Sequence, residues 1–249
     1  DTAQTWYRYH PLFSQTLRIL SREADPEGST RLLRQACCWM QTNGYSSKAV
    51  TYALDSGDFE CAAEIIESCA LAAVTHFNLT DLVQWVNRLS PDMLEARPQL
   101  GIYVALAHFL MGQADKVEPR LRQIELELEK KSSSIQPGFD QDFIHWQIAA
   151  LRAVLACLSE ANEHTIGQLI RLRANPPPND VYFVGSMTHI LADAYVQTGQ
   201  LENALVEYQR GMDFALQHNL TYEVAYSLTG HANVLKRQGR LTLLEQDYL

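Results

Sequence analysis

The chain reads LADAYVQTGQLENALVEY over residues 191–208, and it reads LKRQGRLTLLEQDY over residues 235–248. Two landmarks recur at one spacing, because Gly199 and Gly239 lie 40 residues apart and Tyr208 and Tyr248 lie 40 residues apart. A period of this length is typical of stacked helical hairpins, each of which buries its apolar face on its neighbours. The repeat therefore predicts an all-α solenoid rather than one closed globule.

The residue types in this repeat have a physical reason. Small residues such as Ala192 and Ala204 are expected where two helices cross, and Leu191 and Tyr208 are expected to fill the gaps between hairpins. Gly199 is expected at the turn, because glycine adopts a positive φ at little cost. Looser copies of the turn occur at Gly44, Gly57 and Gly112. We expect a right-handed superhelix of tetratricopeptide-like hairpins, with helices over residues 180–198, 201–218 and 221–238.

Composition restricts the possible functions. The chain has 249 residues, of which 47% are hydrophobic and 20% are charged, so it has enough apolar residues for an extended core. Its formal net charge is −9 and its basic residues are scattered, which argues against nucleic-acid binding by this chain. No apolar run approaches the roughly 20 residues that a membrane span needs. We therefore expect a soluble, cytoplasmic chain that binds no membrane.

Breaks in the pattern suggest three parts. Residues 1–24 are rich in aromatic and apolar side chains, including Trp6, Tyr7 and Phe13, and they resemble the tail of a preceding domain. Residues 25–97 form a helical arm, interrupted near its end by prolines at 91 and 98, and residues 98–249 form the repeat region. Connectors are expected at 132–138 and 175–179. The last hairpin is short, so we expect the repeats to continue past residue 249.

The search for catalytic chemistry is negative. The sequence has no phosphate-binding glycine loop, no nucleophile elbow and no H-E-x-x-H zinc motif. Its eight histidines include no pair at i, i+3 or i+4, so we expect no metal site. The five cysteines lie within apolar helical stretches and are expected to be reduced and packed: Cys37, Cys38, Cys61, Cys69 and Cys157. We expect a protein that is not an enzyme.

A row of hairpins offers a concave surface lined by the first helix of each hairpin. If Leu191, Ala192 and Tyr195 face the core, one set of polar positions should face the groove, and the next hairpin should repeat that set. The predicted groove residues are Ser186, His189, Asp193, Gln197, Tyr226, Thr229, Asn233 and Lys236, with Trp146 and Tyr182 as aromatic walls. Such residues suit a small polar ligand. The same pattern also fits solvent-facing polar residues and ordinary core aromatics.

Four stretches carry a resemblance to a known family. They are WYRYHPLF at residues 6–13, Leu33-x3-Ala36-x2-Trp39-x3-Asn43-Gly44, the Ala49–Glu67 segment with Gly57-Asp58, and Leu82-x2-Trp85 through Arg97-Pro98-x-Leu100. Together they resemble the MalT-like branch of the LuxR family of bacterial transcription activators. The similarity covers about the first 130 residues.

The resemblance implies a larger protein. Members of that family combine an ATPase module, a winged-helix segment, a helical superhelix that binds an inducer, and a helix-turn-helix that binds DNA. By resemblance, residues 1–24 end the winged-helix segment and the remainder is the arm and sensor region. ATP is implied only for the complete family protein, and this chain carries neither an ATP-binding motif nor a helix-turn-helix.

The sequence leaves several functions open. The expected partner is a small-molecule inducer or a regulatory protein, with self-association possible in the complete protein. The alternatives to a sensor are a protein-interaction module that binds a peptide or helix in the groove, an arm that only spaces other modules, and a helical enzyme. The last would need a closed pocket with carboxylates of shifted pKa.

Overall fold

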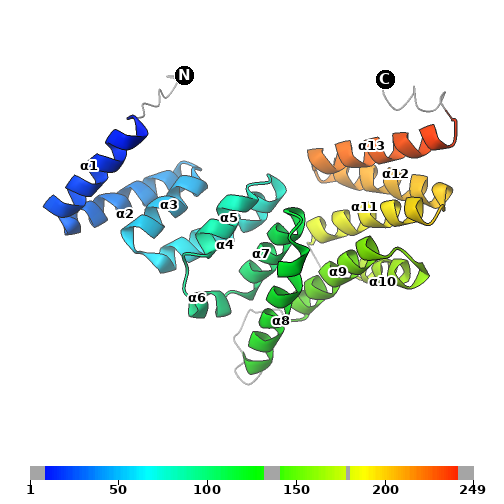
Figure 1. Cartoon of the computed structure of the whole chain (residues 1–249), viewed down its shortest axis with the longest axis horizontal. Coiled ribbons are helices and arrows are strands. Elements are labelled where there is room, and N and C mark those ends of the chain that lie inside the picture. The colour runs from blue at the N-terminus through cyan, green and yellow to red at the C-terminus, as the bar shows by residue number, and fades with distance from the viewer. Residues whose placement is uncertain (1–8, 132–140, 178–179, 241–249) are drawn as a thin grey trace. The chain divides into compact units, whose positions relative to one another are not determined.

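The computed structural model is helical throughout the residues that it describes, 9–131, 141–177 and 180–240 (Figure 1). Those ranges contain thirteen helices and no strand, so the all-α prediction is confirmed. Several predicted features lie outside the described residues. They are Trp6 and Tyr7, the connector at 132–138, part of the connector at 175–179, and the last helix, with Leu244 and Tyr248.

The chain divides into two units, Asp1–Gln113 and Ala114–Leu249. The first unit contains α1 (Pro11–Ala24), α2 (Pro26–Thr42), α3 (Ser46–Ser56), α4 (Phe59–Thr75), α5 (Leu79–Val86), α6 (Pro91–Glu95) and α7 (Pro98–Leu110). Within it, α2 packs on α3, α3 on α4, and α4 on both α5 and α7. Its core consists mainly of alanine and branched aliphatic residues, such as Ala62, Ile66 and Leu82, all of which are inaccessible to solvent.

The second unit contains α8 (Ala114–Lys131), α9 (Gln141–Ser159), α10 (Glu163–Ala174), α11 (Val181–Gln197), α12 (Leu201–Gln217) and α13 (Thr221–Arg237). The last three helices agree closely with the predicted ranges. Consecutive helices from α9 to α13 pack on each other, and α11 also contacts both α9 and α13. The first helices of successive hairpins therefore lie side by side, as a helical repeat requires.

One turn geometry joins many of these helices. Gly199 has a φ of 75°, its N–H donates to Val196 O at 3.2 Å, and the Gln200 N–H donates to Tyr195 O at 2.8 Å. This is the Schellman pattern, which satisfies the last carbonyls of a helix. The same pair of bonds follows Gly44, Gly57, Gly112 and Gly239, whose φ values are 79°, 77°, 72° and 72°. The predicted glycine turn is confirmed.

The turn also occurs without glycine. Phe77 and Asn219 have φ values of 58° and 57°, and the same hydrogen bonds surround them. These residues end α4 and α12, one in each unit. The turn is therefore a property of the hairpin architecture, and glycine is its least strained residue.

Other helix starts are built by side-chain caps. Asp180 accepts from the Phe183 N–H at 3.1 Å at the start of α11, and Asn162 forms a capping box with Thr165 at the start of α10.

Pro91 and Pro98 begin α6 and α7 at the first helical position, where a missing N–H costs nothing. The short helix α6 was not predicted.

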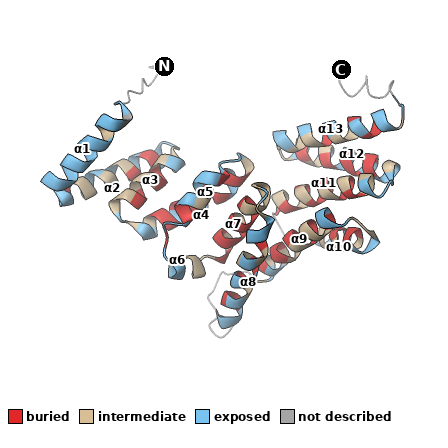
Figure 2. Ribbon diagram, viewed as in Figure 1, coloured by how far each residue is buried: buried red, intermediate tan, exposed pale blue. Residues whose placement is uncertain are grey.

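Burial differs along the chain. Figure 2 shows buried residues concentrated on helices such as α7, α11 and α12, whereas α1 is exposed along nearly all of its length. In the second unit, one core cluster joins α11, α12 and α13 through Ala192, Ala204, Leu205, Tyr208, Val234 and Leu235. Ala204 has no exposed surface. Its predicted place at a helix contact agrees with this burial.

Candidate functional site

Three of the residues predicted for the groove, His189, Asp193 and Tyr226, meet between α11 and α13. Asp193 of α11 accepts two hydrogen bonds, one from the Tyr208 hydroxyl at 2.5 Å and one from the Tyr226 hydroxyl. Tyr208 comes from α12 and Tyr226 from α13, so a single carboxylate connects three helices. Burial and the adjacent carboxylate both raise the pKa of each tyrosine, and both phenols are therefore protonated donors at neutral pH.

His189 lies one turn before Asp193 on α11. Its Nε2 is 2.9 Å from the Ser227 hydroxyl, and its ring centroid is 5.1 Å from that of Tyr226. Both His189 and Ser227 are buried. Burial lowers the pKa of His189 to about 4, although the charge of Asp193 opposes this shift. The imidazole is therefore neutral at neutral pH and forms a polar contact inside the repeat.

Two glycines make room for this cluster, which we call the Asp193 cluster (His189, Asp193, Tyr208, Tyr226 and Ser227). A Cβ on Gly230 would lie 2.2 Å from Cε1 of Tyr208, and a Cβ on Gly211 would lie 2.9 Å from the Ser227 hydroxyl oxygen. Neither helix could approach as closely with a larger residue. The glycines thus act through close packing, since neither of them has a positive φ.

A buried carboxylate, Glu207, lies in the same unit. Glu207 of α12 forms an ion pair with Arg173 of α10, whose Nη2 is 3.1 Å from Oε1, and it also contacts Arg210. Arg173 further approaches the Thr188 hydroxyl at 3.4 Å. Because both charges have partners, this group connects α10, α11 and α12 without leaving a buried charge unpaired.

Tyr182 and Ser186 lie further toward the start of α11. Burial raises the pKa of Tyr182 to about 12, although the neighbouring Ser186 hydroxyl opposes this shift. The charges of Glu223 and Tyr222, both on α13, also raise the pKa of Tyr182. A half-buried aromatic and polar face therefore spans the first turns of α11 and α13. We call Tyr182, Ser186, Tyr222, Glu223 and Tyr226 the tyrosine face.

The other predicted groove residues do not join these groups. Gln197, Thr229, Asn233 and Lys236 are exposed, and the Thr229 hydroxyl donates to the carbonyl of Ala225 at 2.8 Å within its own helix. Trp146 is half-buried on α9; its indole N–H donates to Leu172 O at 3.3 Å, and its ring packs edge-on against Phe183. The structure therefore groups His189, Asp193 and Tyr226, and separately Tyr182 and Ser186.

Sequence reasoning missed two members of the Asp193 cluster. Tyr208 was expected only as a filler between hairpins, and Ser227 was not singled out. Asp193 and Tyr226 are 33 residues apart, which differs from the 40-residue repeat of this chain. Only the packing of α11 on α13 therefore reveals the pair. A half-buried carboxylate gains from nearby hydrogen-bond donors, and the tyrosines of the neighbouring helices were the available signal.

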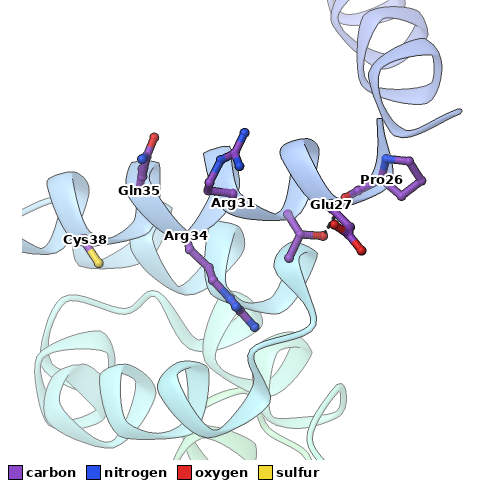
Figure 3. A pocket seen from close by; sticks show the side chains of 7 residues that line it. Pro26, Glu27, Arg31, Arg34, Gln35 and Cys38 are labelled. Atoms are coloured by element: carbon purple, nitrogen blue, oxygen red, sulfur yellow. Dashed lines mark hydrogen bonds between the residues drawn. The ribbon is translucent and has the colours of Figure 1, made fainter. Parts of the chain in front are cut away.

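A separate hollow follows one face of α2 in the first unit (Figure 3). Figure 3 shows Arg34 and Cys38 projecting to the same side of the helix, while Arg31 and Gln35 project to another. The hollow is lined by Pro26, Glu27, Thr30, Arg31, Arg34, Gln35 and Cys38. It combines positive charge with an exposed thiol.

A further hollow lies between α9 and α10, over the small residues Ala149, Ala153 and Ala156. Arg152 borders it, but this guanidinium is already held by Glu118 at 3.0 Å and by Glu125 at 2.7 Å. Hydrogen bonds from Arg152 lower the pKa of both carboxyls. Arg152 is therefore engaged in connecting α8 to α9.

Metal binding, membrane spanning and similarity to known proteins restrict the interpretation of these sites. Within the described ranges, no three histidine, cysteine or acidic side chains are grouped so as to hold a metal ion. None of the described helices is both long and apolar enough to cross a bilayer. No protein-family model matches the chain, and no solved structure is significantly similar to it.

Proposed function

We propose that this chain is the effector-sensing helical-repeat region of a bacterial transcription activator of the MalT-like branch of the LuxR family. In this proposal the chain itself is not an enzyme and contacts no DNA. It would couple binding of an inducer to ATP-dependent oligomerisation and DNA binding by other modules of a cytoplasmic protein. The sequence motifs described above support the family, and the repeated hairpins support the sensor role.

The observation that carries the sensor role is the tyrosine face. Tyr182 on α11 is within electrostatic reach of Tyr222 and Glu223 on α13, and the two helices pack on each other, so one ligand could contact two consecutive hairpins. Aromatic rings offer apolar contact area, while hydroxyl and carboxylate groups orient polar atoms, which is the usual composition of a small-molecule site. Asn233 and Lys236, two of the exposed groove residues, add polar groups further along α13.

The mechanism follows from contact with two hairpins at once. A ligand that contacts both α11 and α13 favours the arrangement in which those contacts are made together. Each tenfold preference for that arrangement shifts the equilibrium by about 1.4 kcal/mol. The Asp193 cluster, which shares Tyr226 with the tyrosine face, would transmit this preference to α12 because its hydrogen bonds join all three helices.

The test is a thermal-denaturation screen of the 249-residue chain. Mono- and oligosaccharides, amino acids, nucleosides and short-chain carboxylates are added separately, and unfolding is followed by circular dichroism. At least one class should raise the Tm, because a ligand that binds only the folded state stabilises it. The increase should disappear in Ser186→Ala combined with Glu223→Gln.

The matched control is Val206→Ala, a change at a 56% exposed position three turns before the end of α12. This variant should keep the full ligand-induced increase in Tm. An increase that survives in the Ser186/Glu223 double variant would remove the proposed site. No increase with any class would remove the small-molecule sensor itself.

A protein partner is the second candidate, and α1 favours it. Leu12, Phe13 and Leu20 on this helix are 69%, 52% and 54% exposed, and clustered apolar side chains at a surface often mark protein contacts. If a regulatory protein binds here, Leu12→Ser with Phe13→Ser should abolish its capture without altering the helical circular dichroism. Capture that depends instead on Asn233 and Lys236 would place the partner in the groove.

A further inference from the structure

Three cysteines of the first unit lie close together across two helices. The thiols of Cys37 on α2 and Cys61 on α4 are near enough to shift each other's pKa, and Cys38 is near enough to influence both. Cys37 is only 2% exposed, Cys61 is half-buried and Cys38 is exposed. All five cysteines were expected to be packed, but Cys38 is exposed, and the proximity of Cys37 to Cys61 was not predicted.

An independent contact holds the same two helix turns together. Asp58 at the start of α4 accepts from the Cys61 N–H at 3.3 Å, and its other oxygen is 3.4 Å from Nε of Arg34. Arg34 precedes Cys37 by one turn of α2, just as Asp58 precedes Cys61 by one turn of α4. The Arg34–Asp58 ion pair therefore holds the two helices together one turn before the two cysteines.

We propose that Cys37 and Cys61 form an intramolecular disulfide that ties α2 to α4 when the chain meets an organic disulfide oxidant such as glutathione disulfide. Because the Arg34–Asp58 ion pair holds α2 and α4 together one turn before these cysteines, the two neighbouring thiols need little movement to reach bonding distance. The proposal is independent of the proposed sensor function, since it concerns the first unit alone. It assigns these residues a modification site rather than a purely structural role.

The chemistry proceeds by two exchanges. The Cys61 thiolate attacks glutathione disulfide, forming a mixed disulfide on Cys61 and releasing one glutathione thiolate. The Cys37 thiolate then attacks the Cys61 sulfur and displaces the second glutathione. The two cysteines lose two protons and two electrons, and glutathione disulfide gains both to become two glutathione molecules.

The surroundings predict a slow reaction and a competing site. Burial raises the pKa of Cys37 to about 12 and also raises the pKa of Cys61, which keeps the reactive thiolates scarce at neutral pH. Cys38 lines the α2 hollow and projects to the same side of the helix as Arg34 (Figure 3), whose charge suits the anionic oxidant. A mixed disulfide on Cys38 is therefore the expected side product.

The experiment uses a chain in which Cys38→Ser, Cys69→Ser and Cys157→Ala leave only Cys37 and Cys61. After incubation with glutathione disulfide, the protein is quenched with an alkylating agent and analysed by intact mass spectrometry. The expected product is lighter by two hydrogen atoms, takes up no alkyl group and reverts with dithiothreitol. Its Tm should rise by several degrees, because the cross-link restricts the unfolded chain.

Cys61→Ser in the same background is the matched control, and it should give only a glutathione adduct or alkylated Cys37. Disulfide mapping of the wild-type chain by fragmentation provides a second measurement if the substituted background folds poorly. A product that contains only glutathione adducts would overturn the proposal. So would a wild-type cross-link from Cys61 to Cys38 or to Cys69.

Discussion

The α3–α4 hairpin of the first unit and the α11–α12 hairpin of the second share one turn but bury different chemistry. Gly57 and Gly199 adopt the same left-handed conformation with the same pair of hydrogen bonds, and a fully buried alanine follows each of them by five residues, Ala62 and Ala204. Around Ala62 the core is aliphatic. Beside Ala204, the second unit has a buried histidine and a buried tyrosine, His189 and Tyr208, next to a half-buried carboxylate and a half-buried tyrosine, Asp193 and Tyr226.

In these two hairpins, one set of residues specifies the hairpin itself and another set specifies its interior. The turn and the small crossing residue specify a hairpin in either unit, and they do so without regard to the rest of the interior. The interior residues then decide what the hairpin can do. A polar interior depends on complete hydrogen bonding, so the α11–α13 packing should tolerate fewer changes than the α3–α4 packing.

The largest expected effect is at Gly230 in the polar interior. Gly230→Ala should lower the free energy of unfolding by about 3 kcal/mol, because its Cβ would meet the buried Tyr208 ring at 2.2 Å. Gly167→Ala on α10 is the control; its Cβ would lie at an ordinary 3.5 Å from its nearest neighbour, so better helix propensity should stabilise the chain by about 0.5–1 kcal/mol. Urea denaturation measures both. Equal effects would mean that α13 does not pack closely on α12.

The crossing alanines test what the two hairpins share. Ala62→Leu and Ala204→Leu should each destabilise the chain by about 1–3 kcal/mol through overpacking, since neither alanine has exposed surface. Val206→Leu, at a position 56% exposed on α12, should leave the Tm unchanged. A silent Ala204→Leu with a damaging Ala62→Leu would show that the repeat frame applies to the first unit only.

A pH titration should distinguish the two interiors. The pKa of His189 falls from 6.5 in the unfolded chain to about 4 in the fold, so the unfolded state binds more protons between these values. Its contribution to stability is complete above pH 6.5 and is lost as the pH falls towards 4, by about 1–2 kcal/mol between pH 7 and pH 5.

His189→Gln should remove that part of the pH dependence, measured by urea denaturation at each pH. The groups facing His189 are Asp193 on α11 and Ser227 and Tyr226 on α13. An unchanged slope in His189→Gln would assign the titration to other groups. The carboxyls with lowered pKa values, Glu118 and Glu125, should contribute only at lower pH.

The smallest expected effect is at the two turns that lack glycine. Asn219→Gly should stabilise the chain by about 0.5 kcal/mol or less, because asparagine already tolerates a φ of 57°. Gly199→Ala should instead destabilise it by about 1 kcal/mol, since alanine is strained at a φ of 75°. Thermal melting of both variants checks the order. A stabilising Gly199→Ala would contradict the common turn.

Much of the fold was predictable because helical repeats place their signals close together in sequence. The boundaries of α11, α12 and α13 follow from Gly199, Gly239 and the apolar spacing between them. The helix α6 was missed because Pro91 and Pro98 were interpreted as interruptions, although proline also starts helices. The candidate site was only partly predictable, since helical spacing identified polar positions on α11 and α13 without saying which of them would be buried.

The sequence by itself determined the all-helical class, the hairpin turns and the alanines at helix crossings, because these depend on local backbone preference and on residue size. Only the tertiary structure decided that Asp193 joins Tyr208 to Tyr226, that His189 is buried against Ser227, and that Cys37 meets Cys61. Each of these contacts joins side chains on different helices. Their distance is set by how closely the helices pack, which no local pattern encodes.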